Sequence, residues 1–191
     1  LRAIKSRRTI YALAAGGGLG ATFYAYFYDW TYILMSVAVL SVFFLFNRKF
    51  AEFKVLLWIL AAVLVVSGFY WINFLEFNRL PQFDDIVSRM GVEVSNQFRW
   101  LSVWKSYARI IVLSAALWFF VRKKDELLTY FIVSLLGAYF IAVNLQVVAG
   151  FNPQPDHWYR EQFLPAALAL AAIFSLTARR WQVNAQRLTI A

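Results

Sequence analysis

Cysteine is absent from this chain of 191 residues, and histidine occurs once, at position 157. Without cysteine the chain forms no disulfide, and it holds no thiolate-ligated zinc or iron–sulfur cluster. A single histidine also excludes metal sites that need two histidines, and no metal site is assigned. Charged residues make up 15% of the chain, against about 25% in an ordinary globular protein. With 62% apolar residues, this composition predicts an integral membrane protein.

Long apolar runs predict an all-α fold with about six transmembrane helices. A helix needs about 20 residues to cross the hydrocarbon core of a bilayer. The fourth run is the shortest, because only Ile110 to Val121 is uncharged. We expect that span to extend upstream past Arg109 and Lys105, whose long side chains can reach the membrane surface. The predicted spans cover residues 9–28, 31–47, 55–75, 104–121, 127–149 and 162–178 of a single transmembrane domain.

Short connections and small residues predict how the first spans pack. Asp29 and Trp30 separate the first two apolar runs and predict a tight turn between them. Four glycines, at positions 16, 17, 18 and 20, lie in the middle of the first run. Because small residues in lipid allow a neighbouring helix to approach closely, we expect these glycines to mark a helix contact.

The distribution of charge predicts the orientation of the chain. With six spans and a cytoplasmic N-terminus, thirteen of the nineteen Lys and Arg residues lie inside, and seven of the ten acidic residues lie outside. This asymmetry follows the positive-inside rule and favours a bacterial inner membrane with both termini in the cytoplasm. The net charge of +9 therefore reports topology, and we expect no nucleic-acid partner.

The first long outer segment, residues 76–105, carries apolar residues at steps of three and four opposite a polar face. This spacing predicts an amphipathic helix over about 82–103 that lies at the extracytoplasmic interface. Asp84 and Asp85 fall in its first turn, where carboxylates favour the positive end of the helix dipole. They either cap this helix or form a paired-carboxylate site that acts as a base or binds a metal.

The second outer segment, residues 150–161, is chemically the densest part of the chain. Its prolines restrict the backbone and hold Gln154, Asp156, His157 and Arg160 in a confined region. Histidine titrates near neutral pH, so His157 is a candidate general acid or base, or a single ligand to a pigment or metal. Arg160 is the candidate phosphate partner, and Asp156 and Gln154 are candidate substrate contacts.

A structural interpretation of the same loop stays open. In it Asp156, His157 and Trp158 form an interfacial cap, with a hydrogen-bond network that closes the loop over the helices. Asn144 and Gln146 lie near the outer end of the fifth predicted span. Such amides commonly join helices by hydrogen bonds. Alternatively they line a polar cavity below the loop, which makes Asn144 a candidate substrate contact.

Two short motifs in this region carry a resemblance. Asn144–Gly150 reads NLQVVAG and Gln154–Trp158 reads QPDHW, and a final apolar helix follows. Over about residues 127–178, the chain resembles bacterial polytopic membrane proteins that are similar to C-type-fold glycosyltransferases. The resemblance implies a substrate linked to a polyprenyl phosphate. In that class the catalytic carboxylate typically lies in the first large outer loop, whereas the first outer turn here offers only Asp29.

Two functions follow from these patterns. One is a structural or binding subunit of a larger membrane assembly, which packs against protein partners, lipids or pigments. The other is a membrane module of a glycosyltransferase-like enzyme with an extracytoplasmic site for a lipid-linked substrate. That site would use His157, Asp84 or Asp85 in catalysis and Arg160 for the phosphate. Six spans are few for such enzymes, so we expect a fragment or a small accessory subunit, and no cofactor is assigned.

Overall fold

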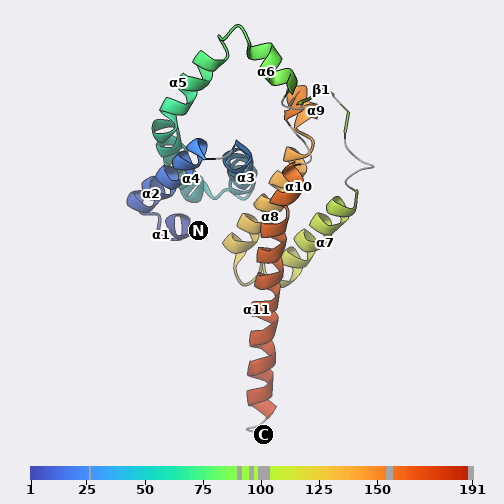
Figure 1. The fold of residues 1–191 in the computed structure, drawn as a ribbon. Helices are drawn as coiled ribbons and strands as arrows, with labels where there is room; N and C mark the ends of the chain where they lie inside the picture. The colour runs from blue at the N-terminus through green and yellow to red at the C-terminus, as the bar shows by residue number, and fades with distance from the viewer. Residues whose placement is uncertain (26, 90–91, 95–96, 99–103, 154–156, 189–191) are drawn as a thin grey trace.

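The computed structural model describes residues 1–25, 27–89, 92–94, 97–98, 104–153 and 157–188. These residues are almost entirely helical, as the apolar runs predict, and the helices stand side by side in an open bundle (Figure 1). The elements in chain order are α1 (Arg2–Ser6), α2 (Thr9–Ala21), η1 (Thr22–Tyr24), α3 (Phe27–Phe46), α4 (Phe50–Val66), α5 (Gly68–Phe77), α6 (Phe83–Arg89), β1 (Val92–Val94), α7 (Trp104–Phe120), α8 (Glu126–Ala142), α9 (Leu145–Ala149), β2 (Phe151–Pro153), α10 (Trp158–Glu161) and α11 (Phe163–Leu188).

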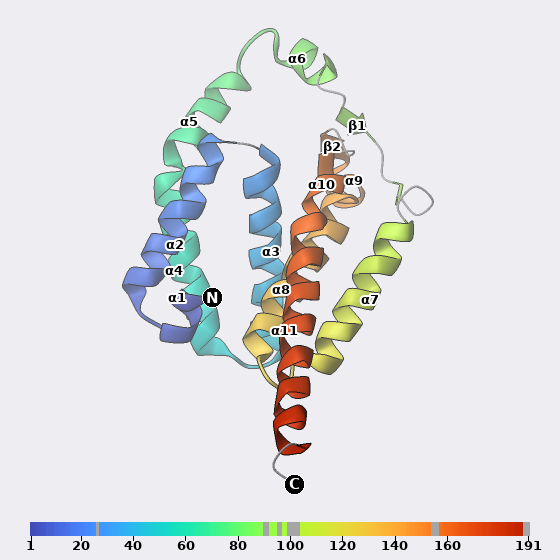
Figure 2. The ribbon, with the colours of Figure 1, turned by 60° about the horizontal axis from the view of Figure 1, so that its bottom comes forward.

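Helices α3 and α8 pack against each other at the centre of the bundle (Figure 2). The Tyr32 hydroxyl on α3 donates a hydrogen bond of 2.5 Å to the backbone carbonyl of Leu135 on α8. Further along α3, the ring of Phe43 stacks on the ring of Tyr130 on α8, with centroids 5.2 Å apart. Two apolar cores flank this pair, one formed mainly with α7 and α11 and the other with α1, α2 and α4.

Glycines on α2 let it approach α4 closely, which confirms the expected helix contact for two of the four positions. A Cβ at Gly16 would overlap the carbonyl oxygen of Ile59 and lie 2.6 Å from Ala62 Cβ. A Cβ at Gly20 would lie 2.7 Å from Val66 Cβ. The other two glycines, at positions 17 and 18, face open space within the described residues.

The number of helices able to cross a bilayer is smaller than the sequence predicts. By length and composition α3, with 20 residues, is the one described helix that qualifies alone. Helices α4 and α5 qualify together, although the chain bends by 53° between them. At about 1.5 Å per residue, the 13 residues of α2 and the 17 residues of α8 are short of the roughly 30 Å hydrocarbon core.

The turn between the first two helices lies earlier than predicted. Helix α2 ends at Ala21, and Asp29 and Trp30 lie inside the first turn of α3. The Thr22 hydroxyl donates 2.6 Å to the carbonyl of Leu19 at the end of α2. Asp29 then occupies the N-terminal turn of α3, where a carboxylate interacts favourably with the helix dipole. The prediction of a turn at Asp29 and Trp30 is therefore wrong.

The predicted length of the interfacial helix, over about 82–103, is also wrong. Helix α6 ends at Arg89, and β1 pairs antiparallel with β2 in the register Val92 to Pro153, Glu93 to Asn152 and Val94 to Phe151. Val-Glu-Val contains two β-branched residues, which favour an extended backbone. Pairing with β2 provides the backbone hydrogen bonds that this segment would otherwise form within a helix. The outer segments of the chain are therefore joined at this strand pair.

The last helix, α11, is 26 residues long and begins at Phe163 next to Gln162, where the sixth span is predicted to start. It continues past the predicted end at residue 178 and extends beyond the other helices (Figure 1).

Replacing Gly16 by alanine tests the contact between α2 and α4. The added methyl group overlaps the α4 backbone, and overpacking of this kind costs about 1–3 kcal/mol. We expect Gly16→Ala to unfold at a lower temperature than the parent chain in the same detergent, measured by circular dichroism. Gly18→Ala is the matched control, because its Cβ meets no atom within 4 Å. Equal melting temperatures for the two variants would contradict the close packing.

Candidate functional site

The predicted outer loop folds onto the end of the bundle through aromatic contacts. His157 directly precedes α10 and is half-buried, with its ring centroid 5.0 Å from that of Tyr28 on α3. The next residue, Trp158, is fully buried, and its ring meets Tyr28 edge-on at 4.7 Å. The sole histidine therefore lies against an aromatic surface at the N-terminal end of α3.

Asn152 is the centre of a buried polar network below this loop. Its amide Nδ2 donates 2.8 Å to Gln146 Oε1 and 3.1 Å to the carbonyl of Ala142. Its Oδ1 accepts a bond of 2.8 Å from the indole nitrogen of Trp158. All three side chains of this network, Gln146, Asn152 and Trp158, are fully buried. The network joins the end of α8, β2 and α10 through satisfied polar groups.

Asn144 and Gln146 connect this network to the rest of the outer end. Asn144 Nδ2 donates 2.6 Å to the Tyr107 hydroxyl on α7 and 2.9 Å to the carbonyl of Phe140. Gln146 Nε2 donates 3.0 Å to the carbonyl of Gln97. Asn144, a predicted substrate contact, thus has an observed role in joining α7 to α8, which is the packing role that the sequence left open.

Three other residues of the predicted site, Asp84, Asp85 and Arg160, are exposed. Asp84 and Asp85 lie in the exposed first turn of α6, and neither forms an ion pair with a described residue. Arg160 is exposed on α10. Gln154 and Asp156 lie outside the described residues. In the described parts of the chain, no group of three or more His, Asp or Glu side chains could hold a metal ion.

One carboxyl group near the loop has a perturbed acidity. Burial raises the pKa of the Glu161 carboxyl, and the neighbouring Asp29 carboxylate raises it further. Glu161 ends α10, whereas Asp29 lies at the start of α3. Sequence reasoning missed this pair, because the two residues meet only through the packing of α10 on α3.

A second polar site lies at the opposite end of α8, and sequence reasoning missed it as well. Three ion pairs connect separate elements there: Lys5 to Asp125 at 2.9 Å, Arg7 to Glu52 at 2.6 Å and Lys49 to Glu126 at 2.5 Å. Arg122 also lies 3.9 Å from Glu126. We call the three ion pairs between separate elements, Lys5–Asp125, Arg7–Glu52 and Lys49–Glu126, the charged cluster.

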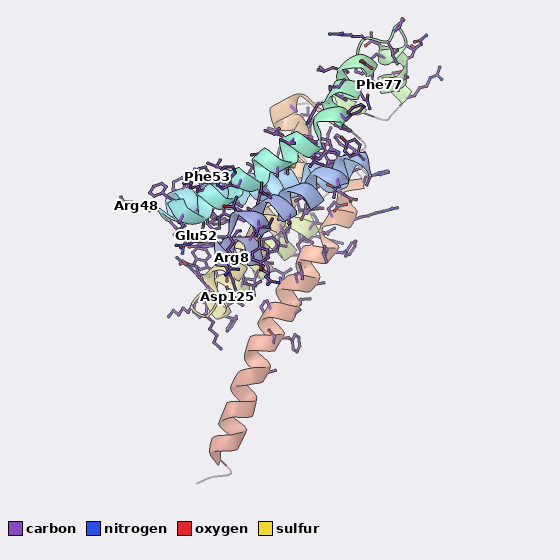
Figure 3. The ribbon with its side chains drawn as sticks, turned by 90° about the vertical axis from the view of Figure 1, so that its left-hand side faces the viewer. Arg8, Arg48, Glu52, Phe53, Phe77 and Asp125 are labelled. Carbon is purple, nitrogen blue, oxygen red and sulfur yellow. The ribbon has the colours of Figure 1, made fainter. Side chains whose placement is uncertain are left out.

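A cavity of about 250 Å³ opens within the charged cluster. Its lining residues are Ile4, Lys5, Arg7, Lys49, Glu52, Leu127 and Tyr130. Figure 3 shows Arg8, Arg48, Glu52 and Asp125 at this end of the molecule and Phe77 at the other. The cavity therefore lies where α1, the start of α4 and the start of α8 meet.

The carboxyl groups of the charged cluster are held in their ionised form. The hydrogen bond from Lys49 lowers the pKa of the Glu126 carboxyl, and a hydrogen bond from the Tyr130 hydroxyl lowers it further. Burial raises the pKa of Glu52 and of Asp125, but hydrogen bonds from Arg7 and Lys5 and from backbone amides outweigh it. Both pKa values therefore lie below their ordinary range.

A signal for the charged cluster was present in the charge count. The predicted cytoplasmic side holds three acidic residues, and all three form ion pairs: Glu52, Asp125 and Glu126. In the segments 2–8, 48–54 and 122–126, three acidic residues among ten basic ones favour the formation of ion pairs.

Comparison with known proteins gives no relative. No family model, no curated protein and no solved structure matches the chain.

Removing Asn152 tests the buried network at the outer end. Asn152→Ala leaves the Trp158 indole, the Gln146 amide oxygen and the Ala142 carbonyl without their partner, and each unsatisfied group costs about 1–3 kcal/mol. We expect a clear loss of thermal stability, measured by the change in tryptophan fluorescence on heating. The control is Asn47→Ala, whose exposed amide lies just after α3 and donates to the carbonyl of Phe43 near the end of that helix. An unchanged melting temperature for Asn152→Ala would contradict the network.

Proposed function

We propose that the chain is a polytopic inner-membrane protein that acts as a structural or binding subunit of a larger membrane assembly. Its helices cross the bilayer six times, both termini lie in the cytoplasm, and the strand pair and α10 lie on the extracytoplasmic side. Its partners are lipid and other membrane subunits.

The observation that carries this proposal is the apolar surface that the helices leave uncovered. Val65 on α4 is 81% exposed and Phe119 on α7 is 80% exposed. None of the ten residues of α5 is buried, although the helix contains Phe69, Ile72 and Leu75. Such surfaces are unfavourable in water over this extent. Lipid tails or the apolar faces of partner subunits would cover them at no such cost.

To cross the bilayer six times, several helices must span it although they are shorter than the hydrocarbon core. Three features would make this possible. Lys105 and Arg109 lie near the start of α7, where their aliphatic stems can lie along the helix with the charges at the interface. After α8 ends at Ala142, the chain continues in α9 toward the outer side. A bilayer also thins locally around a short hydrophobic segment, at a modest free-energy cost per ångström.

The saturated outer network favours a subunit over an enzyme. The hydrogen bonds of this network join Gln146, Asn152 and Trp158 to one another and to the backbone. An enzyme site needs polar groups directed at a substrate. The alternative function, a glycosyltransferase-like module for a lipid-linked substrate, depends on His157 together with the exposed Asp84 and Asp85 of α6.

Native mass spectrometry of the chain, extracted with a mild detergent from its own membrane, distinguishes the two functions. We expect protein partners to remain bound, because the exposed helix faces would be covered by them. An absorption spectrum of the same sample detects a bound pigment. A lone chain that carries a polyprenyl phosphate would contradict the subunit role and support the enzyme.

His157→Ala is the matched variant for this experiment. In a subunit, the variant keeps its partners, since the ring of His157 packs on Tyr28 of this same chain. In the enzyme, it loses turnover while its melting temperature stays that of the parent chain.

A further inference from the structure

The charged cluster combines a cavity with a strong excess of positive charge. The segments 2–8, 48–54 and 122–126 hold ten basic and three acidic residues. Six of these basic side chains are exposed and form no ion pair with a described residue: Arg2, Arg8, Arg48, Lys54, Lys123 and Lys124. An anion near the cavity would therefore meet a net attractive field.

The lining of the cavity contains both basic and aliphatic side chains. Lys5, Arg7 and Lys49 supply the cationic groups, and Ile4 and Leu127 supply aliphatic groups. A phosphate group suits the cationic groups, since guanidinium and ammonium groups bind it by charge-assisted hydrogen bonds. The aliphatic groups suit the glycerol and first acyl carbons of a lipid, which free phosphate lacks.

We propose that this cavity binds the phosphate of an anionic phospholipid headgroup from the cytoplasmic leaflet. The inference rests on the membrane location proposed above. Basic pockets between helices on the cytoplasmic side bind anionic headgroups in this way. The bound lipid would then join α1, α4 and α8, the three elements that meet at the cavity.

The carboxylates of the charged cluster compete with such a ligand, and the competition is weak. The side chains of Lys5 and Arg7 are 55% and 60% exposed in their ion pairs. Exposed ion pairs contribute about 0–1 kcal/mol, so a phosphate can take over these cations at little cost. Glu52 itself lines the cavity. Its negative charge therefore opposes the phosphate directly.

Because of this competition, two substitutions are expected to change the affinity for lipid in opposite directions. The full chain in a nonionic detergent is titrated with short-chain phosphatidylglycerol, and adducts are counted by native mass spectrometry. Glu52→Gln frees Arg7 and removes the opposing charge, so binding tightens by about fivefold, the effect of one charge near a membrane surface. Arg7→Gln weakens it by about fivefold. A merely structural ion pair predicts the same direction for both variants.

Lys54→Gln is the control, because it removes the same charge from an exposed position that does not line the cavity. We expect its affinity to stay within about twofold of the parent chain, since solvent and salt screen an exposed charge that does not line the cavity. A loss as large as that of Arg7→Gln would overturn the site in favour of diffuse attraction. A Glu52→Gln variant that binds no more tightly would overturn it too.

Two further titrations identify the source of the phosphate. Phosphatidylcholine with the same acyl chains has no net charge and is expected to bind more weakly than phosphatidylglycerol. Inorganic phosphate lacks the apolar part, and binding as tight as that of phosphatidylglycerol would overturn the lipid assignment. These measurements are made in detergent, so they are independent of the partner proteins that decide the proposed function.

Discussion

The contact between α3 and α8 is the interaction on which the rest of the structure depends. Helix α3 supplies Tyr28 and Tyr32 to one apolar core and Leu40 and Phe44 to the other. The stacked rings of Phe43 and Tyr130 and the bond from Tyr32 to the α8 backbone hold the two helices together. Without this contact the halves of the bundle would be joined mainly by ion pairs, by the packing of α10 on α3 and by the strand pair.

The two polar groups of the chain lie at the two ends of α8, the charged cluster at its start and the buried network beyond its end. At its first turn Asp125 accepts a capping bond from the amide of Leu128 and pairs with Lys5. Beyond its last turn Gln146 bonds to Asn152. The buried network is expected to stabilise more per bond than the exposed ion pairs, because its groups are shielded from water. We therefore expect the ion pairs to exchange partners more readily than the buried network does.

Local patterns in the sequence predicted the helices, whereas contacts between residues far apart in the sequence were not predicted. Apolar runs gave most helix positions, and Gly16 marked a real contact because small size acts wherever a helix approaches. The strand Val92–Val94 was missed, since its stability comes from β2, far along the chain. The bond between Lys5 and Asp125 joins residues 120 positions apart. His157 was found from its chemistry, but its neighbour Tyr28 comes from another helix.

Labelling of single cysteines tests most directly whether the two ends of the bundle lie on opposite sides of a membrane. The chain has no native cysteine, so the background is nil. Ser88 on α6 and Lys124 before α8 are both exposed. In intact bacterial cells we expect an impermeant thiol reagent to label Ser88→Cys, and to label Lys124→Cys only after the cells are permeabilised. Labelling of Lys124→Cys in intact cells would contradict the proposed orientation.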